Sequence, residues 1–545
     1  MEIRFKWAKK IKKLIQNNQF ILYLIIFFII YFVFLWVQAN PTFLDPDSFY
    51  HLKISKLIAE QGPIWDFPWL QYTVLKDYYI DHHFLYHVLA IPFIKILGDF
   101  EGLKFFTVIL ATLFVLLSYI FFKKYKIKYA EIFTLILLFS SAFLFRISLA
   151  KAVALSLIFL FLGIYCLFKK KYWLLALISF LYVWSYGGFL LIFIAAFIFV
   201  LAKTIYHTFI AQPLWFELKN FLKLIKIKNY FKLFFKNLFS LDNLKLILAP
   251  FLGIILGLVL NPYFPKNLKF YWQQVIEIGV INYRGLVNVG GEWYPYSLAE
   301  LMTNSGIVVI IFIVSVILFF IFIKKQKPPS IFFLLTSLLF FVLTLKSRRY
   351  VEYLTPNLVY FSAFTCGYIL AEINFKKFLR QFKKENYILG SLLIFLIIYI
   401  AIIFPCIIIR NAYLTSQSYR GGIEYQRFEG IANYLKQKSR PGDIVMQTDW
   451  DDFPMLFYHN HQNYYIIGLD PTFMYNYDAD LYNLFTEITT ARKFDNLYNE
   501  VKNKFKAKYF IVDADRGQLK RNLQRYSGFV QVYEDQDGTI FKLTK

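Results

Sequence analysis

Residues 20–37 read FILYLIIFFIIYFVFLWV, a continuous apolar run without a single charged side chain. A helix of this length rises about 27 Å, which is close to the roughly 30 Å thickness of the hydrocarbon core of a bilayer. Runs of the same kind recur at residues 307–323 and 388–409. The repetition predicts an α-helical protein that crosses a membrane many times.

The composition supports this interpretation. Of the 545 residues, 58% are hydrophobic and only 17% are charged, which leaves too much apolar surface for a soluble protein of this size. The net charge of +25 does not indicate nucleic-acid binding, because the basic residues stand in short blocks between the apolar runs. The three cysteines, Cys166, Cys366 and Cys406, fall inside apolar segments, so neither a disulfide framework nor a metal–thiolate site is indicated.

The basic blocks determine the predicted path of the chain. Lysine and arginine are enriched in cytoplasmic loops, so all the blocks are placed in the cytoplasm. They are residues 9–13, 123–128, 169–171, 219–245, 324–327 and 376–384. This arrangement predicts about 11 spans, with a cytoplasmic amino terminus, a retained first span and an extracytoplasmic carboxy-terminal domain. The predicted spans are residues 19–39, 103–123, 129–145, 150–168, 172–185, 187–203, 245–262, 305–323, 329–345, 350–371 and 387–409.

One apolar run is too short for a span. Counting residues 84–97 as a crossing would reverse the side of every later basic block, so we expect a helix at the membrane surface. Residues 40–102 then form one large external loop, and residues 263–304 form another. We expect a transmembrane domain over residues 1–415 and a soluble α/β domain over residues 416–545.

Acidic residues open the first external loop. Residues 45–53 read DPDSFYHLK, and the carboxylates of Asp45 and Asp47, one residue apart after a span, can bind a divalent cation. The same letters are also good turn and helix-cap chemistry. Later in the loop, Asp81 and His82 begin the sequence DHHFLYH and can provide a metal ligand or a general base. The alternative there is polar and aromatic anchoring before a surface helix.

Two further groups fall on the same predicted side. Residues 290–295 read GGEWYP, in which Glu292 and Trp293 can contact a polar acceptor, and an ordinary exposed Glu in an aromatic belt is the alternative. Arg348 and Arg349 stand at the external end of a span, against the charge rule, and their guanidinium groups suit a phosphate or pyrophosphate. An ion pair with Glu352, one helical turn later, is the alternative.

The carboxy-terminal part has the composition of a soluble domain. We expect a helix at residues 428–437 and strands at residues 443–446 and 509–513. Between the strands, residues 468–475 (GLDPTFMY) either line an acceptor groove or pack in the core of the domain.

Together these motifs resemble the membrane-embedded GT-C glycosyltransferases, and most closely the STT3-type catalytic subunit of oligosaccharyltransferase in its archaeal and single-subunit bacterial forms. The resemblance covers nearly the whole chain and rests on short motifs. It implies that Asp47 occupies the place of the metal-binding aspartate, with Mg or Mn as the cation. Glu292 resembles the glutamate that contacts the acceptor amide and the metal, and Arg348 or Arg349 resembles the arginine that faces the lipid pyrophosphate.

Two stretches depart from the family pattern. Residues 448–454 (TDWDDFP) stand where the family has Trp-Trp-Asp-Tyr-Gly, and only Trp450 and Asp451 match, as candidate acceptor-binding residues beside Trp293. Residues 145–152 (FRISLAKA) stand where family members have an acidic pair, and they contain no carboxylate. Either Asp81 or a neighbouring histidine replaces the missing metal ligand, or the enzyme works without a firmly held metal ion.

The resemblance implies an enzyme of the plasma membrane. It would transfer a sugar or oligosaccharide from a polyprenyl phosphate or pyrophosphate donor to an acceptor, with protein as the first candidate. The nearest rival is a GT-C enzyme that adds one sugar to a lipid or to a cell-envelope glycan. A transporter or flippase of lipid-linked sugars would be expected to show internal repeats and charges in mid-span, which the sequence does not show. A noncatalytic envelope assembly factor would have no use for the external acids and arginines.

Overall fold

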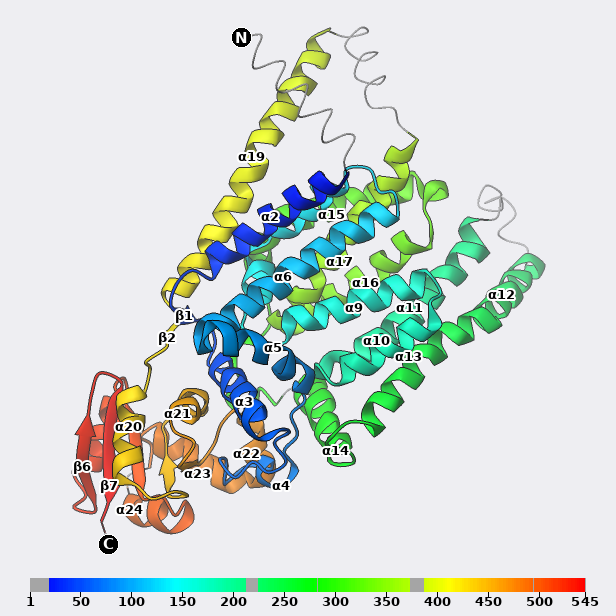
Figure 1. Ribbon diagram of the computed structural model, residues 1–545. Coiled ribbons are helices and arrows are strands. Elements are labelled where there is room, and N and C mark those ends of the chain that lie inside the picture. Colours follow the sequence, from blue (N-terminus) through cyan, green and yellow to red (C-terminus); the bar gives the residue numbers. More distant parts are fainter. Residues whose placement is uncertain (1–18, 212–223, 282, 373–386, 494, 545) are drawn as a thin grey trace.

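The computed structural model describes residues 19–211, 224–281, 283–372, 387–493 and 495–544. A bundle of long helices makes up most of the molecule, and a smaller part that contains a β-sheet lies at one end of it (Figure 1). Every predicted span coincides with a helix. These helices are α2 (Gln19–Val37), α6 (Asp99–Lys124), the pair α7 (Ala130–Ile136) and α8 (Ser141–Ile147), α9 (Val153–Phe168), α10 (Tyr172–Val183), α11 (Leu190–Ile205), α13 (Leu241–Val259), α15 (Leu298–Ile321), α16 (Pro328–Lys346), α17 (Val351–Ala371) and α19 (Tyr387–Arg420).

Not all of these helices are typical membrane spans. By length and composition, seven helices in the described part of the chain can cross a membrane, or eight if α7 and α8, which are bent by 85°, count as one. Helices α9 and α10 are shorter than this criterion requires. Helix α17 carries Thr355, Asn357 and Thr365, which lie buried against neighbouring helices where lipid does not reach them. Position inside the bundle therefore explains why some spans are short or polar.

The predicted surface helix is a separate element. Helix α5 (Phe84–Leu97) has 14 residues and packs against α3 (Asp47–Gln61) and α6. It belongs to the segment between α2 and α6, which also contains α4 (Leu75–Tyr78). Further short helices among the described residues before Gly290 are α12 (Leu224–Leu238), α14 (Lys266–Trp272), the 3-10 helices η1 (Leu137–Phe139) and η2 (Gly187–Phe189), and the π-helices η3 (Tyr206–Ile210) and η6 (Gln273–Ile281).

Local sequence signals explain where key helices begin and pack. Helix α15 starts at a capping box, in which the Ser297 hydroxyl accepts from the backbone of Glu300 and the Glu300 carboxylate accepts in return. Helices α10 and α13 approach closely along Gly253 and Gly257, spaced four residues apart. A Cβ atom on Gly253 would lie 2.1 Å from the carbonyl oxygen of Ala176, so only glycine permits this contact.

The carboxy-terminal part is a mixed α/β structure. Its sheet has the strand order β4-β3-β5-β7-β6, with β3 parallel to β4 and β5, and with β7 antiparallel to β5 and β6. The strands are β3 (Ile444–Met446), β4 (Tyr464–Tyr465), β5 (Tyr509–Asp513), β6 (Phe529–Glu534) and β7 (Gly538–Leu543). The α-helices are α20 (Glu429–Lys438), α21 (Phe453–His459), α22 (Thr472–Tyr477), α23 (Ala479–Thr489), α24 (Leu497–Asn499) and α25 (Gly517–Gln524). The π-helix η11 (Glu500–Lys504) directly follows α24. The predicted helix and both predicted strands are present, while the β6–β7 hairpin was not predicted.

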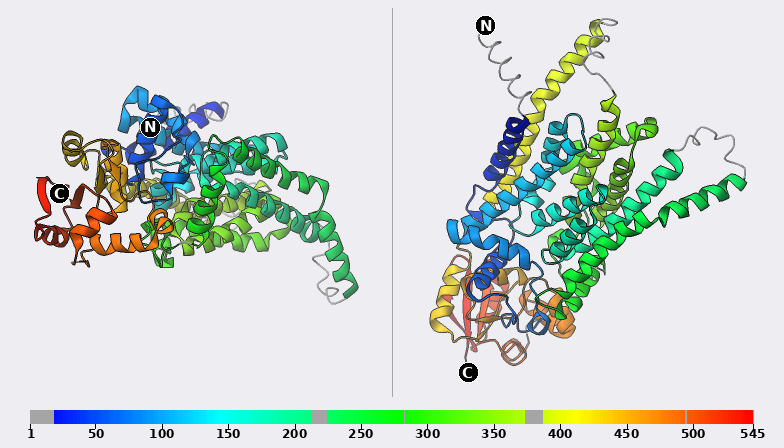
Figure 2. Two further views of the ribbon diagram at one scale, coloured as in Figure 1. Left: turned by 90° about the horizontal axis from the view of Figure 1, so that it is seen from below. Right: turned by 45° about the vertical axis from the view of Figure 1, so that its right-hand side comes forward.

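The carboxy-terminal part is attached to the first loop by backbone pairing. Strand β1 (Thr42–Phe43) pairs with β2 (Ile423–Glu424), and Leu70 forms a parallel bridge with Tyr465. The indole of Trp69 donates to the carbonyl of His461 at 2.7 Å. Both views of Figure 2 keep α3 and its loop beside the carboxy-terminal part.

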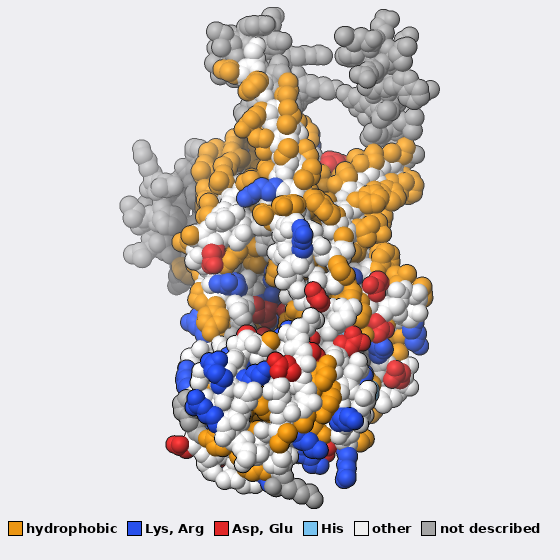
Figure 3. Space-filling model, turned by 90° about the vertical axis from the view of Figure 1, so that its left-hand side faces the viewer, with side chains coloured by type: hydrophobic (Ala, Val, Ile, Leu, Met, Phe, Trp, Pro, Cys, Tyr) orange, Lys and Arg blue, Asp and Glu red, His pale blue; other side chains and the backbone are white. Residues whose placement is uncertain are grey.

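The surface changes character along the molecule. In Figure 3, apolar side chains dominate the upper part, and charged side chains gather on the lower part, with acidic groups in a recess between the two. This distribution fits helices surrounded by lipid and a carboxy-terminal part in water.

Candidate active site

The predicted functional segments meet around one cavity of about 670 Å³ at the end of the bundle that faces the carboxy-terminal part. The start of α3, the link between α8 and α9, the 3-10 helices η7 (Gly291–Trp293) and η9 (Arg348–Tyr350), and η10 (Trp450–Asp452) all contribute to its wall. These segments are far apart in the sequence, since the lining includes both Asp45 and Asp451. The charge rule had placed all of them on one side of the membrane, and the structure brings them to one end of the bundle.

Asp45 and Asp47 are held by a lysine. The backbone N–H of Asp47 donates to the Oδ1 atom of Asp45 at 2.9 Å, which fixes the turn at the start of α3. The Nζ atom of Lys151 lies 2.8 Å from Asp45 Oδ1 and 2.7 Å from Asp47 Oδ2. The lysine side chain is 13% exposed, so the ammonium is largely withdrawn from water.

The environment of Asp47 adjusts its proton affinity. Burial raises the pKa of Asp47 to about 6, and the Lys151 ammonium opposes this shift while the Asp45 carboxylate adds to it. Asp47 is therefore ionised at neutral pH, with a pKa close enough to neutrality for efficient proton transfer.

Two carboxylates share Arg146, which lies in the last turn of α8. Its Nη1 atom is 2.5 Å from Glu292, and its Nη2 atom is 2.7 Å from Glu352. Glu352 is fully buried and belongs to the first turn of α17. The sequence had suggested an arginine of its own segment as the partner of Glu352. The observed partner comes from a different helix, because α8 and α17 pack together.

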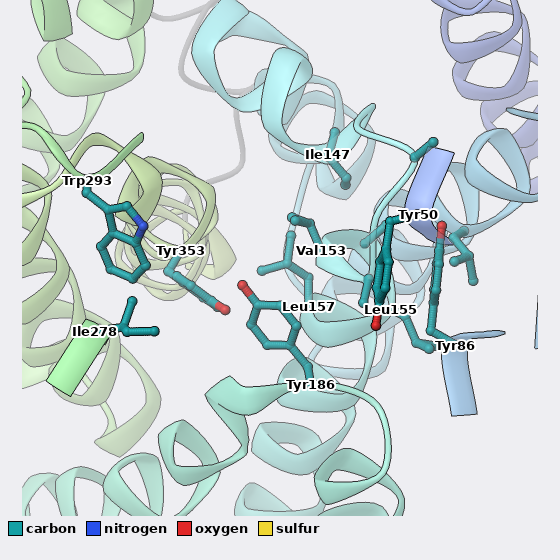
Figure 4. Packing of buried hydrophobic residues seen from close by; sticks show 14 of the residues in the cluster. Tyr50, Tyr86, Ile147, Val153, Leu155, Leu157, Tyr186, Ile278, Trp293 and Tyr353 are labelled. Carbon is teal, nitrogen blue, oxygen red and sulfur yellow. The ribbon is translucent and has the colours of Figure 1, made fainter. Parts of the chain in front are cut away.

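Arg349 faces the other side of Glu292. Its Nη1 atom is 3.5 Å from Glu292 Oε1, its Nη2 atom donates to the Tyr186 hydroxyl at 2.6 Å, and its guanidinium lies 4.4 Å from the centre of the Trp293 ring. Figure 4 shows the rings of Trp293, Tyr186 and Tyr353 converging from three separate segments. Burial alone would raise the pKa of Glu292, but Arg349 and Arg146 outweigh burial and hold this pKa well below its usual range.

Arg348 is placed at the rim of the same cavity. Its side chain is 42% exposed and lies 3.8 Å from Glu300, and its Nη2 atom donates to the carbonyl of Pro295 at 3.3 Å. The two adjacent arginines therefore differ: Arg349 is locked among aromatic rings, and Arg348 can turn toward a ligand in the cavity.

The carboxy-terminal part contributes an aromatic and acidic wall. Trp450 lies over Gly290, where an added Cβ atom would be 3.5 Å from the indole ring. Burial raises the pKa of Asp451 to about 8, and the negative charges of Asp47 and Asp449 add to this shift. Of the GLDPTFMY stretch, Leu469 and Asp470 line the cavity. Phe473 and Met474 of this stretch lie in the core.

Asp81 and His82 lie outside this cavity lining. The Asp81 carboxylate is 2.7 Å from His87 Nδ1, and His87 Nε2 is 2.7 Å from His51 Nδ1, in a buried chain of three side chains. The His82 ring lies against His83 and Phe270. The predicted metal-ligand role of Asp81 and His82 beside Asp47 is therefore not supported, because these two residues serve to pack and orient the histidine cluster.

The remaining carboxylates do not fit a divalent cation. Among the described residues, no group of three His, Cys, Asp or Glu side chains is arranged to hold a metal ion. Asp45 and Asp47 already surround the Lys151 ammonium, and Glu292 lies between two arginines. We therefore derive no chemical step from a metal ion.

Sequence reasoning missed the cations that hold these acids. Arg146 and Lys151 both belong to the FRISLAKA stretch, which had drawn attention only because it lacks an acidic pair. Tyr186, whose hydroxyl accepts from Arg349, was likewise not identified as a site residue. The signal that could have identified them is the presence of two cations, five residues apart, in an external link between apolar helices.

Comparison with known proteins gives a consistent result for the fold. No protein-family model matches the sequence, and no curated protein matches it significantly. The apo crystal structure of the Archaeoglobus fulgidus oligosaccharyltransferase matches with a TM-score of 0.61 and 14% identity, over 96% of this chain and 74% of that chain. The oligosaccharyltransferase AglB from Archaeoglobus fulgidus, in complex with an inhibitory peptide and a dolichol-phosphate, matches with a TM-score of 0.58 and 13% identity, over 97% and 75%.

A second kind of glycosyltransferase matches as well. The mycobacterial arabinofuranosyltransferase AftD has a TM-score of 0.55 and 10% identity, over 96% of this chain and 40% of that chain. Identities this low establish architecture and not activity. The chain has the GT-C membrane fold, in the form seen in STT3-type oligosaccharyltransferases.

Proposed function

We propose that the protein is a membrane glycosyltransferase that moves a sugar or oligosaccharide from a polyprenyl phosphate or pyrophosphate donor to an acceptor, with protein as the first candidate. The observation that carries this proposal is the meeting of Asp47, Glu292 and the Arg348–Arg349 pair at one cavity, at the end of an apolar helix bundle. We further propose that this end faces the extracytoplasmic side of the plasma membrane, with residues 1–415 as the membrane domain and residues 416–545 as the soluble domain.

The arginines would bind the donor phosphate. Guanidinium groups suit phosphate because their donors form a planar fork, and a buried arginine stabilises the negative charge that develops on a leaving phosphate. Arg349 is fixed by Tyr186 and Trp293, and Arg348 stands at the rim where an incoming headgroup would arrive. The polyprenyl tail would remain among the lipid-facing helices.

Asp47 would act as the general base. The acceptor oxygen or nitrogen forms a bond to the anomeric carbon of the sugar, and the bond from that carbon to the phosphate oxygen breaks. The electron pair stays on the departing phosphate, beside the arginines, and the acceptor proton passes to the Asp47 carboxylate. Glu292, held by Arg146 and Arg349, would orient the acceptor by accepting a hydrogen bond.

The aromatic wall would bind the acceptor. Trp450 and Trp293 border the cavity from opposite parts of the chain, and aromatic faces pack well on peptides and on sugars. Asp451, with its pKa raised to about 8, would be protonated at neutral pH and able to donate a hydrogen bond.

A second candidate is transfer of a single sugar to a lipid or cell-envelope glycan. The observation that favours it is the sequence TDWDDFP, in which only Trp450 and Asp451 match the motif that holds the acceptor hydroxyl in the oligosaccharyltransferases. The likeness to AftD also shows that this fold occurs in enzymes other than oligosaccharyltransferases.

The test is transfer from radiolabelled lipid-linked sugars by the purified protein in detergent. We expect Asp47→Asn to reduce transfer by about 100-fold or more, as expected for loss of a general base. Asp77→Asn changes an exposed acid of the same loop and serves as the matched control, with activity expected to be unchanged. Unaltered transfer by Asp47→Asn would refute the assigned role.

The acceptor is identified in the same assay. Label found on a peptide containing Asn-x-Thr supports protein glycosylation, whereas label found on lipid or glycan, with the size of one sugar, supports the second candidate. No transfer to any acceptor from any lipid-linked donor would count against both.

A further inference from the structure

Lys151 stands where a bound cation would be expected. Its ammonium bridges carboxylate oxygens of two different residues, at 2.8 Å from Asp45 and 2.7 Å from Asp47. A Mg²⁺ ion would have to lie about 2.0–2.1 Å from the same oxygens. The lysine nitrogen and such an ion cannot share this space, because each would contact the same lone pairs.

The lysine is built into the fold and is not a surface side chain that happens to reach the acids. Residues 148–152 connect the bent α7–α8 pair to α9, and this link is buried except for the partly exposed Lys151. The carbonyl of Ser148 accepts hydrogen bonds from the side chains of Gln38, directly after α2, and Tyr419, in α19. The backbone that carries Lys151 is therefore anchored beside the two aspartates.

Glu292, which lines the cavity, and the neighbouring Glu352 already have cationic partners. Glu292 is shared between Arg146 and Arg349, and Glu352 is bound to Arg146. Recruiting Glu292 to a metal would remove the carboxylate that Arg349 contacts and one of the two that Arg146 contacts, which is costly. Asp45, Asp47 and Glu292 are thus all held in internal ion pairs.

We infer that Lys151 takes the place of a divalent cation between Asp45 and Asp47, so that the reaction at this site needs no metal ion. This inference rests on the proposed function for its catalytic meaning. The ammonium would keep Asp45 and Asp47 together, hold Asp47 at the cavity, and provide a fixed positive charge near the departing phosphate. The position lies in the stretch where related enzymes have an acidic pair, so the charge at this place is reversed, from ligand to cation.

The first experiment measures metal binding and does not depend on activity. Purified protein is stripped with EDTA, titrated with Mn²⁺ and followed by electron paramagnetic resonance and by thermal unfolding. We expect no stoichiometric Mn²⁺ binding and no change in melting temperature for the wild type. We expect Lys151→Asp, which adds a third carboxylate and removes the cation, to bind Mn²⁺ and to be stabilised by it. Lys95→Gln, a change at an exposed lysine, should behave as the wild type.

The second experiment measures transfer with EDTA and with added Mn²⁺ or Mg²⁺. We expect the wild type to have the same rate under all these conditions, and Lys151→Gln to lose about 100-fold or more without rescue by metal. Binding of one Mn²⁺ by the wild type, or transfer abolished by EDTA and restored by Mn²⁺, would overturn the inference while leaving the proposed function intact. If the wild type transfers no sugar under any condition, the proposed function fails, and the Mn²⁺ titration still decides whether Lys151 excludes a metal.

Discussion

Arg146 connects parts of the site that otherwise belong to different segments. It is buried in α8 and binds Glu292 from the loop between α13 and α15 and Glu352 from α17. Its Nε and Nη2 atoms both contact Glu352 Oε2, at 2.9 and 2.7 Å. A guanidinium can make such contacts to two carboxylates at once because its donors point in several fixed directions.

Removing this guanidinium should cost stability. We expect Arg146→Met to lower the free energy of unfolding by about 3–5 kcal/mol, because the fully buried Glu352 would lose its counter-ion and Glu292 would lose one of its two cationic partners. Thermal or denaturant unfolding in detergent measures the effect. Arg420→Met, at an exposed arginine, is the control, with an expected change below about 0.5 kcal/mol. Similar losses for both variants would contradict the role given to Arg146.

Asp451 should make stability depend on pH. Its pKa is raised to about 8 by burial first, and in the unfolded chain it would be near 4. A raised carboxyl pKa contributes stability that is complete below the unfolded value and is lost as pH rises toward the folded value. We therefore expect Asp451→Asn to gain melting temperature over the wild type as pH rises from about 5 to about 8.5. Asp515→Asn, at an acid that is 77% exposed, should show no such trend.

Single residues were predictable where their position was unusual. Asp47, Glu292 and Arg349 stood out because charged groups at the ends of apolar runs need a reason to be there. Lys151 could not be assigned a partner, because the sequence does not show which acids lie across the cavity from it. Asp81 could not be placed for the same reason: the structure shows its carboxylate 2.7 Å from His87 Nδ1, and Asp81 is not among the residues that line the cavity.

At the scale of elements, the contact between α10 and α13 shows how small residues organise the bundle. The carbonyl of Ala176 and the backbone of Phe180 lie against Gly253 and Gly257. In a lipid environment, such close backbone contact provides much of the attraction between helices.

A methyl group at Gly253 should separate these helices. Its Cβ atom would lie 2.1 Å from the backbone oxygen of Ala176, which cannot move aside as the end of a flexible side chain can. We expect Gly253→Ala to destabilise the protein by about 1–3 kcal/mol, measured by thermal unfolding in detergent. In Gly306→Ala the new Cβ would meet only the end of Met302 at 3.6 Å, so this control should be neutral or slightly stabilising. A neutral Gly253→Ala would show that the helices do not need this contact.

Elements were predicted better than their details. Long apolar runs and basic blocks were sufficient to locate the helices, because periodicity and length are properties of one segment. The bend of 85° between α7 and α8 was not predicted, since Ser140, which caps α8 through its hydroxyl, looks like any polar residue in a span. The β6–β7 hairpin was not predicted because its strands carry Lys, Gln and Glu on an exposed face.

At the scale of the whole molecule, labelling of single cysteines tests which end of the helix bundle faces the cell exterior. We expect Asp515→Cys to react with a membrane-impermeant maleimide on intact cells, and Lys169→Cys to react only after the membrane is opened. Both positions are exposed, and the background should have Cys166, Cys366 and Cys406 replaced by serine. Labelling of Lys169→Cys on intact cells, with Asp515→Cys protected, would reverse the proposed orientation.

The pairing of β1 with β2 joins Thr42 to Glu424, and the cavity wall is completed by residues of η10 that come later still. During translation, the aspartates leave the ribosome long before the segments that enclose them. A nascent chain therefore holds its acids and arginines in an unfinished state until synthesis is nearly complete.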